Sequence, residues 1–192
     1  WRGCSVPARH VGVTGGGPLL SYETTDLTTA MKQRGLHITS ETGGTVYKPV
    51  ECDLMSISPK LANSTPEGNW AERHERLRYQ PDVLRRLMTD FNYQLKFVIS
   101  DPGDIDEVRT MSAQLGATSD RVLLMPEGTD SATVAERGRW LTQIGMHEGY
   151  RSSPRMHWAR WGYGRARDGV AQPLGPSAPR GGRGGRRTHG RR

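Results

Sequence analysis

The chain has 192 residues, a length that suits one domain with a tail, and it contains only two cysteines, Cys4 and Cys52. Two cysteines do not imply a disulfide framework, and a reducing cytoplasm is the simplest setting for them. No apolar run approaches the ~18–20 residues of a membrane span. Residues 159–192 contain nine arginines and one acid, a net +8. Subtracting this from the total of +7 leaves about −1 for the rest, so the basic character belongs to the tail.

Hydrophobic patterning predicts strands and helices that alternate along the chain, after an irregular segment at 1–9. Residues 61–79 are polar, and we read them as a long loop over the edge of the sheet, with room for a helical turn. Strands are expected at 10–14, 36–39, 53–58, 93–100, 121–125 and 150–157, and helices at 22–34, after Pro81, at 104–115 and at 131–148.

This alternation predicts an α/β domain over residues 10–158, with parallel strands joined by right-handed crossovers. The pattern fits a partial (β/α) barrel and an open doubly wound sheet equally well. The tail at 159–192 is rich in Gly and Arg, and between 162 and 192 only Val170 and Leu174 are aliphatic residues larger than Ala. Such a segment buries too little to offset its ordering entropy, so we expect disorder.

Three predicted strands end in glycine or small polar residues, at Thr14–Gly17, Ser40–Gly44 and Ser58–Lys60. Glycines after a strand let a ligand approach the backbone closely, although a plain tight turn needs the same residues. In α/β proteins the carboxyl ends of the strands meet at one edge, where binding sites form. The three segments therefore predict a ligand site at that edge.

Four segments carry a family resemblance: Thr14-Gly-Gly-Gly-Pro-Leu19, Ser40-Glu-Thr-Gly-Gly-Thr45, the run from Asp53 to Pro66, and Phe97-Val-Ile-Ser-Asp-Pro-Gly-Asp104. Together they resemble the 7-carboxy-7-deazaguanine synthases, which are radical S-adenosylmethionine enzymes of the queuosine (7-deazapurine) pathway. The resemblance extends from about His10 to His157, and its most specific part is the run at 53–66.

The resemblance implies a partial (β/α) barrel whose N-terminal strand–helix unit is missing. It implies a carbon–nitrogen lyase that converts 6-carboxy-5,6,7,8-tetrahydropterin to 7-carboxy-7-deazaguanine with release of ammonia. S-adenosylmethionine, a [4Fe–4S] cluster and Mg²⁺ are the family's cofactors, and a homodimer is its expected assembly.

A cluster of this kind needs three closely spaced cysteine thiolates. Cys4 and Cys52 are 48 positions apart in the sequence and do not form such a group. Either the chain is truncated before its first residue, Trp1, or it is a cluster-free relative that retains binding. We favour truncation and expect this 192-residue chain to be inactive.

Individual positions carry over from the family motifs. Thr14 and His157 match substrate-binding positions, whereas Gly17 stands where the family has a Glu that accepts hydrogen bonds from the cofactor's ammonium group. The predicted S-adenosylmethionine contacts are Gly15, Gly16, Ser40, Glu41, Ser58, Pro59, Lys60, Ser100 and Asp101. The simpler alternatives are turn glycines, an edge carboxylate paired with Lys or Arg, a surface lysine and a structural histidine.

A second hypothesis treats the chain as a nucleic-acid-binding protein acting through Arg180–Arg187. Alternating Arg and Gly supplies mobile positive charge that follows phosphate backbones and would bind polyanions weakly. This segment contains no Phe or Tyr for stacking on bases. We therefore favour the enzyme hypothesis.

Overall fold

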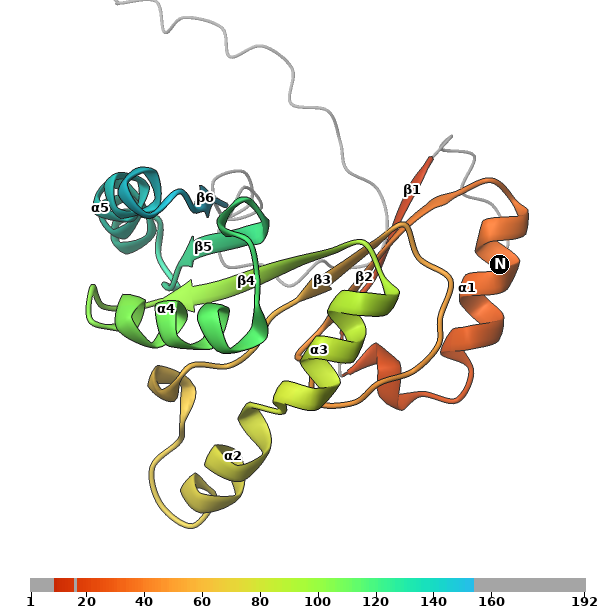
Figure 1. The fold of residues 1–192 in the computed structure, drawn as a ribbon, viewed down its shortest axis with the longest axis horizontal. Helices are drawn as coiled ribbons and strands as arrows, with labels where there is room; N and C mark the ends of the chain where they lie inside the picture. The colour runs from red at the N-terminus through yellow and green to blue at the C-terminus, as the bar shows by residue number, and fades with distance from the viewer. Residues whose placement is uncertain (1–8, 16, 154–192) are drawn as a thin grey trace, which may run out of the picture.

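The structure is a computed structural model that describes residues 9–15 and 17–153. Its centre is a parallel sheet of six strands (Figure 1). The strands are β1 (His10–Val13), β2 (His37–Thr42), β3 (Leu54–Ile57), β4 (Tyr93–Ile99), β5 (Val122–Pro126) and β6 (Arg151–Ser152). The helices are α1 (Thr24–Gln33), α2 (Ala71–Arg78), α3 (Pro81–Asp90), α4 (Asp104–Leu115) and α5 (Ser131–Glu148), with short 3₁₀ turns η1 (Pro18–Leu20), η2 (Ala62–Ser64) and η3 (Ser119–Arg121).

The strands lie side by side in the same order as in the sequence, from β1 to β6, and each neighbouring pair is parallel. A doubly wound sheet would reverse its strand order partway across, and this sheet does not. Right-handed crossovers between successive neighbours keep the connecting helices on one face. The order therefore decides between the two predicted architectures in favour of the partial (β/α) barrel.

The two faces of the sheet differ in character, as β4 shows. Leu95, Phe97 and Ile99 are fully buried and belong to the hydrophobic core with residues of α3, α4 and α5. Figure 1 shows α3 and α4 side by side in front of strands β3 and β4. Gln94 and Lys96 alternate with the core residues and lie on the other face, where they are only partly exposed. One face of the sheet thus forms the core, and the opposite face carries polar side chains.

Most helix boundaries match the sequence prediction because local residues define them. Pro81 occupies the first turn of α3, and Gly116 ends α4 in a left-handed conformation with φ 67°. The carboxylate of Asp130 accepts a hydrogen bond from the Thr133 N–H at 2.8 Å and caps α5, which spans 131–148 as predicted. Among the described residues no helix is long and apolar enough to cross a membrane.

Three predicted segments differ in the structure. Strand β2 continues to Thr42 rather than ending at 39, because Ser40 and Thr42 are small enough to be buried beside Ile38 on the core face. The loop predicted at 61–79 contains helix α2, which projects away from the sheet and buries none of its residues (Figure 1). The strand predicted at 150–157 is only Arg151–Ser152 within the described residues, and its last four positions, like the tail, lie outside them.

We predict that Gly44→Ala lowers the free energy of unfolding by about 2–4 kcal/mol. Gly44 is buried with φ 74°, and an added Cβ would collide with the side chain of Leu84 and lie 3.0 Å from Ile57 Cγ2. Gly43→Ala is the control, because its Cβ would meet no atom within 4 Å. Urea denaturation of both variants tests this prediction, and equal stabilities would show that the packing around Gly44 is not restrictive.

Candidate functional site

The predicted site residues lie at or near the carboxyl ends of β1 to β4, which share one edge because the strands are parallel. Thr14 and Gly15 follow β1. Glu41 is the penultimate residue of β2, and Ser58–Lys60 follows β3. Ser100 and Asp101 follow β4. Two of the predicted residues, Gly16 and His157, lie outside the described residues.

On the polar face of the sheet, the carboxylate of Glu41 contacts side chains from two other parts of the sheet. The Thr14 hydroxyl donates a hydrogen bond to Glu41 Oε2 at 2.9 Å, and Lys96 Nζ lies 3.3 Å from Oε1. Thr14 follows β1 and Lys96 belongs to β4, so the carboxylate connects residues from across the sheet. The sequence prediction missed Lys96 because alternation identified it only as a strand residue, and nothing local marked its partner.

Ser40 points in the opposite direction from Glu41. Its residue is 0% exposed, and its Oγ has no hydrogen-bond partner among the described residues. It shares the core face with Ile38 and Thr42, so the structure does not bring its side chain to the face that carries Glu41.

The glycines after β1 have different surroundings. Gly15 has φ 97°, and a Cβ there would meet no atom within 4 Å, so a ligand could approach its backbone. Gly17 has φ 85°, and a Cβ there would lie 2.7 Å from Leu20 Cδ1. A residue with a side chain at this position would therefore be strained in the present loop conformation.

The segment after β3 is fixed by Arg78, a partly buried arginine at the end of α2. Pro59 is buried, whereas Lys60 is exposed. Arg78, whose side chain is 13% exposed, donates from Nη1 to the Lys60 carbonyl at 3.0 Å and to Glu107 Oε1 at 2.7 Å. The second carboxylate oxygen of Glu107 accepts a hydrogen bond from the Ala62 N–H at 2.9 Å. Arg78 of α2 and Glu107 of α4 thus fix the backbone at Lys60 and Ala62.

A second polar cluster joins this segment to the loop after β4. The Asn63 amide donates to Asp104 Oδ2 at 2.7 Å and to Ser100 Oγ at 3.1 Å. The backbone N–H groups of Ser100 and Asp101 also donate to Asp104 Oδ2, at 2.8 and 3.0 Å. Burial alone would raise the pKa of Asp104, but these donors outweigh burial and lower that pKa below its ordinary value. Asp104 is therefore ionised at neutral pH and accepts all of these hydrogen bonds there.

The described residues do not fit an iron–sulfur cluster. Within 9–15 and 17–153 no three His, Cys, Asp or Glu side chains are grouped so that they could hold a metal ion. Cys52 is the cysteine of these ranges, and burial, together with the neighbouring charge of Asp53, raises the pKa of its thiol to about 11. A thiol with this pKa is protonated at neutral pH, whereas cluster ligation requires a thiolate.

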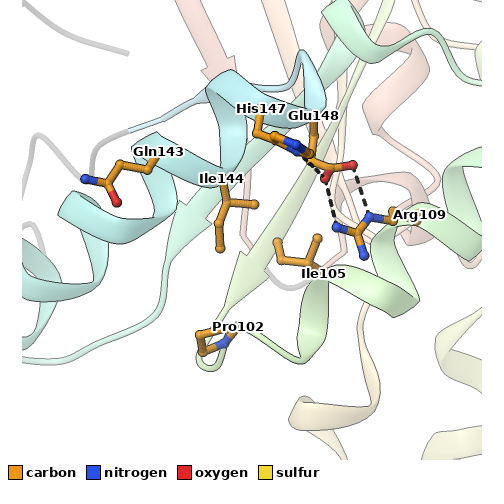
Figure 2. Close-up of a pocket in the computed structure, with 7 residues that line it drawn as sticks. All are labelled: Pro102, Ile105, Arg109, Gln143, Ile144, His147 and Glu148. Atoms are coloured by element: carbon orange, nitrogen blue, oxygen red, sulfur yellow. Dashed lines mark hydrogen bonds and ion pairs between the residues drawn. The ribbon is translucent and has the colours of Figure 1, made fainter.

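A separate hollow of about 300 Å³ lies between α4 and α5, lined by Pro102, Ile105, Arg109, Gln143, Ile144, His147 and Glu148 (Figure 2). Arg109 donates two hydrogen bonds to Glu148, at 3.0 and 2.8 Å, which lowers the pKa of Glu148 to about 2. Both charges are satisfied by this pair, and none of the predicted site residues lines the hollow. It is therefore distinct from the candidate site.

The fold and the site together define a parallel α/β protein whose strands follow one another in sequence order and whose candidate site lies at the strand ends. Solved structures with a similar fold exist. The structure of QueE from Escherichia coli matches with a TM-score of 0.51 and 23% identity, over 77% of this chain and 57% of that one. The structure of Streptococcus suis SuiB bound to S-adenosylmethionine matches with a TM-score of 0.53 and 12% identity, over 79% and 39% of the two chains. These likenesses concern the fold.

Sequence similarity identifies the relatives of this chain as 7-carboxy-7-deazaguanine synthases. It is 39% identical over 168 residues to that enzyme from Halobacterium salinarum and 33% identical over 158 residues to that from Rhodopirellula baltica. Each match covers 80% of this chain, which spans 65% and 61% of the two relatives' lengths. No family model matches the chain. The resemblance drawn from the sequence motifs is thus confirmed.

We predict that Arg78→Met destabilises the protein by about 2–4 kcal/mol, because it leaves Glu107 with an uncompensated charge in a partly buried position. Arg85→Met is the matched control, since the Arg85–Asp82 pair is largely exposed and should contribute less than about 1 kcal/mol. Chemical denaturation compares the two variants. Equal losses in the free energy of unfolding would mean that partial burial does not strengthen the contribution of the Arg78–Glu107 pair to stability.

Proposed function

We propose that this chain forms the cofactor- and substrate-binding part of a 7-carboxy-7-deazaguanine synthase, acting on 6-carboxy-5,6,7,8-tetrahydropterin. The observation that carries the proposal is the contact between Thr14 and Glu41, because it joins two of the family-like motifs at one edge of the sheet. The similarity to named synthases over 80% of the chain supports the same conclusion.

We propose that S-adenosylmethionine binds the polar groups at this edge. Its ammonium and ribose hydroxyl groups need acceptors, and Glu41 presents a partly exposed carboxylate. Its carboxylate needs a cation, for which we propose Lys60, and Ser58 and Ser100 supply hydroxyl groups nearby in the strand-end loops. The open space beside Gly15 allows the ligand to reach the backbone. When bound, the cofactor supplies the adenosyl group that removes hydrogen from the substrate.

For the pterin we propose Thr14 and His157. Because the Thr14 hydroxyl proton is donated to Glu41, its oxygen is left to accept a hydrogen bond from a ring N–H of the substrate. Its role would then be to orient the heterocycle. Mg²⁺ and a homodimer are further proposals that follow from the family.

The described residues supply binding but no iron ligands, so we derive no radical step from them. Two widely separated cysteines in the whole sequence cannot provide three cluster ligands. We predict negligible iron after anaerobic reconstitution and no cleavage of S-adenosylmethionine by this 192-residue chain. Iron analysis and the visible spectrum measure this, and stoichiometric iron with a charge-transfer band would contradict it.

Binding of S-adenosylmethionine tests the site. Without a cluster to chelate its amino and carboxylate groups, and with Gly17 in place of an acidic residue, we expect dissociation constants from high micromolar to millimolar. Lys60→Ala should weaken binding further by roughly 10-fold or more, since one charge-assisted contact contributes ~1.5–3 kcal/mol.

Lys48→Ala is the control, because Lys48 contacts the Ser21 carbonyl and the Tyr22 ring after β1 and has no proposed role in the site. Calorimetric or NMR titration measures all three proteins. Low-micromolar binding by the unchanged chain, or equal binding by the Lys60 and Lys48 variants, would refute the assignment.

A further inference from the structure

Lys96 is a partly buried cation on the polar face of the sheet. Its side chain is 16% exposed, and its Nζ lies 3.3 Å from Glu41 Oε1, whose own side chain is 44% exposed. The pair spans from β4 to β2, across the intervening strand β3. On that strand the small residue Ser56, in register with Glu41, accepts a hydrogen bond from the Gln94 amide at 3.0 Å. A lysine buried to this degree normally has a specific partner.

The two oxygens of Glu41 have different partners. Thr14 donates to Oε2 at 2.9 Å, and Lys96 contacts Oε1. One partner follows the edge strand β1 and the other lies near the centre of the sheet, so together they fix the position and the rotation of the carboxylate. An ionised carboxylate offers about four lone-pair sites, and these contacts occupy two. One acceptor site on each oxygen remains for a ligand.

An acceptor pair held in a fixed orientation is suited to a vicinal diol, whose two hydroxyl groups can each donate to one oxygen. We infer that Lys96 is a positioning residue that orients Glu41 to accept both ribose hydroxyl groups of an adenosyl ligand, and thereby selects ribose over deoxyribose. This inference rests on the proposed function, because it takes the ligand to be S-adenosylmethionine or a close analogue.

A second lysine–carboxylate pair provides a matched control. Lys32 Nζ lies 2.7 Å from Asp53 Oδ1, with both side chains about one-third exposed. Asp53 immediately precedes β3, so this pair lies at the amino ends of the strands, opposite the candidate site. Loss of either lysine removes one partly exposed ion pair, but only loss of Lys96 changes the surroundings of Glu41.

The experiment is an NMR titration of the full chain with S-adenosylhomocysteine and with its 2′-deoxyribose analogue. We expect the unchanged protein to prefer the ribose compound by about tenfold, the effect of one charge-assisted hydrogen bond. Lys96→Gln should weaken binding of the ribose compound by about tenfold and bring the preference close to one. Lys96→Arg should retain the preference, and Lys32→Gln should leave both affinities unchanged.

A positioning role through Glu41 has one more consequence. In a Glu41→Gln background, Lys96→Gln should cause no further loss of preference, whereas a lysine that bound the ligand directly would still cause one. If the unchanged chain binds neither compound, the proposed function fails. If it binds both and Lys96→Gln retains the ribose preference, the inference about Lys96 fails while the proposed function stands. Amide spectra of Lys96→Gln and Lys96→Arg verify folding.

Discussion

The parallel, in-order pairing of the strands is the constraint on which the rest of the molecule depends. It places the connecting helices on one face, where Phe97 and its neighbours form the core, and leaves the other face to polar residues. It also brings the carboxyl ends of the strands to one edge. Residues as distant in sequence as Thr14, Glu41 and Lys96 can meet only because of this arrangement.

The loops of the candidate site are held by polar contacts in addition to the core, to which Leu19 after β1 and Leu61 after β3 belong. Arg78 fixes the backbone at Lys60. Asp104 accepts hydrogen bonds from the Asn63 amide and from the Ser100 N–H at the start of the loop after β4. Polar clusters of this kind specify geometry, because each donor and acceptor must be satisfied in one arrangement. Helix α2 buries no residue, and its clearest link to the site is this set of hydrogen bonds made by Arg78.

The sequence predicted those elements that have an apolar period and a local boundary signal. Helix α4 shows both, with Val108 on its buried side and Gly116 at its end. Helix α2 could not be predicted, since it has no buried face, and the end of β2 was missed because a buried Ser40 looks like a loop residue. The role of Lys96 was invisible for another reason: its partner lies 55 positions away and two strands across.

Cys52 lies at the edge of the sheet opposite the candidate site. Cys52 precedes β3, at the amino ends of the strands, whereas Thr14, Glu41 and Lys60 lie toward the carboxyl ends. In a parallel sheet these two edges are separated by the length of the strands, so no rearrangement of side chains would carry Cys52 to the site. Its raised thiol pKa agrees with a structural role, since a partly buried thiol that stays protonated is a poor ligand and a poor nucleophile. At the carboxyl ends of the strands, the described residues offer groups suited to recognition: the Glu41 carboxylate, the neighbouring Lys96 ammonium group and the open backbone at Gly15.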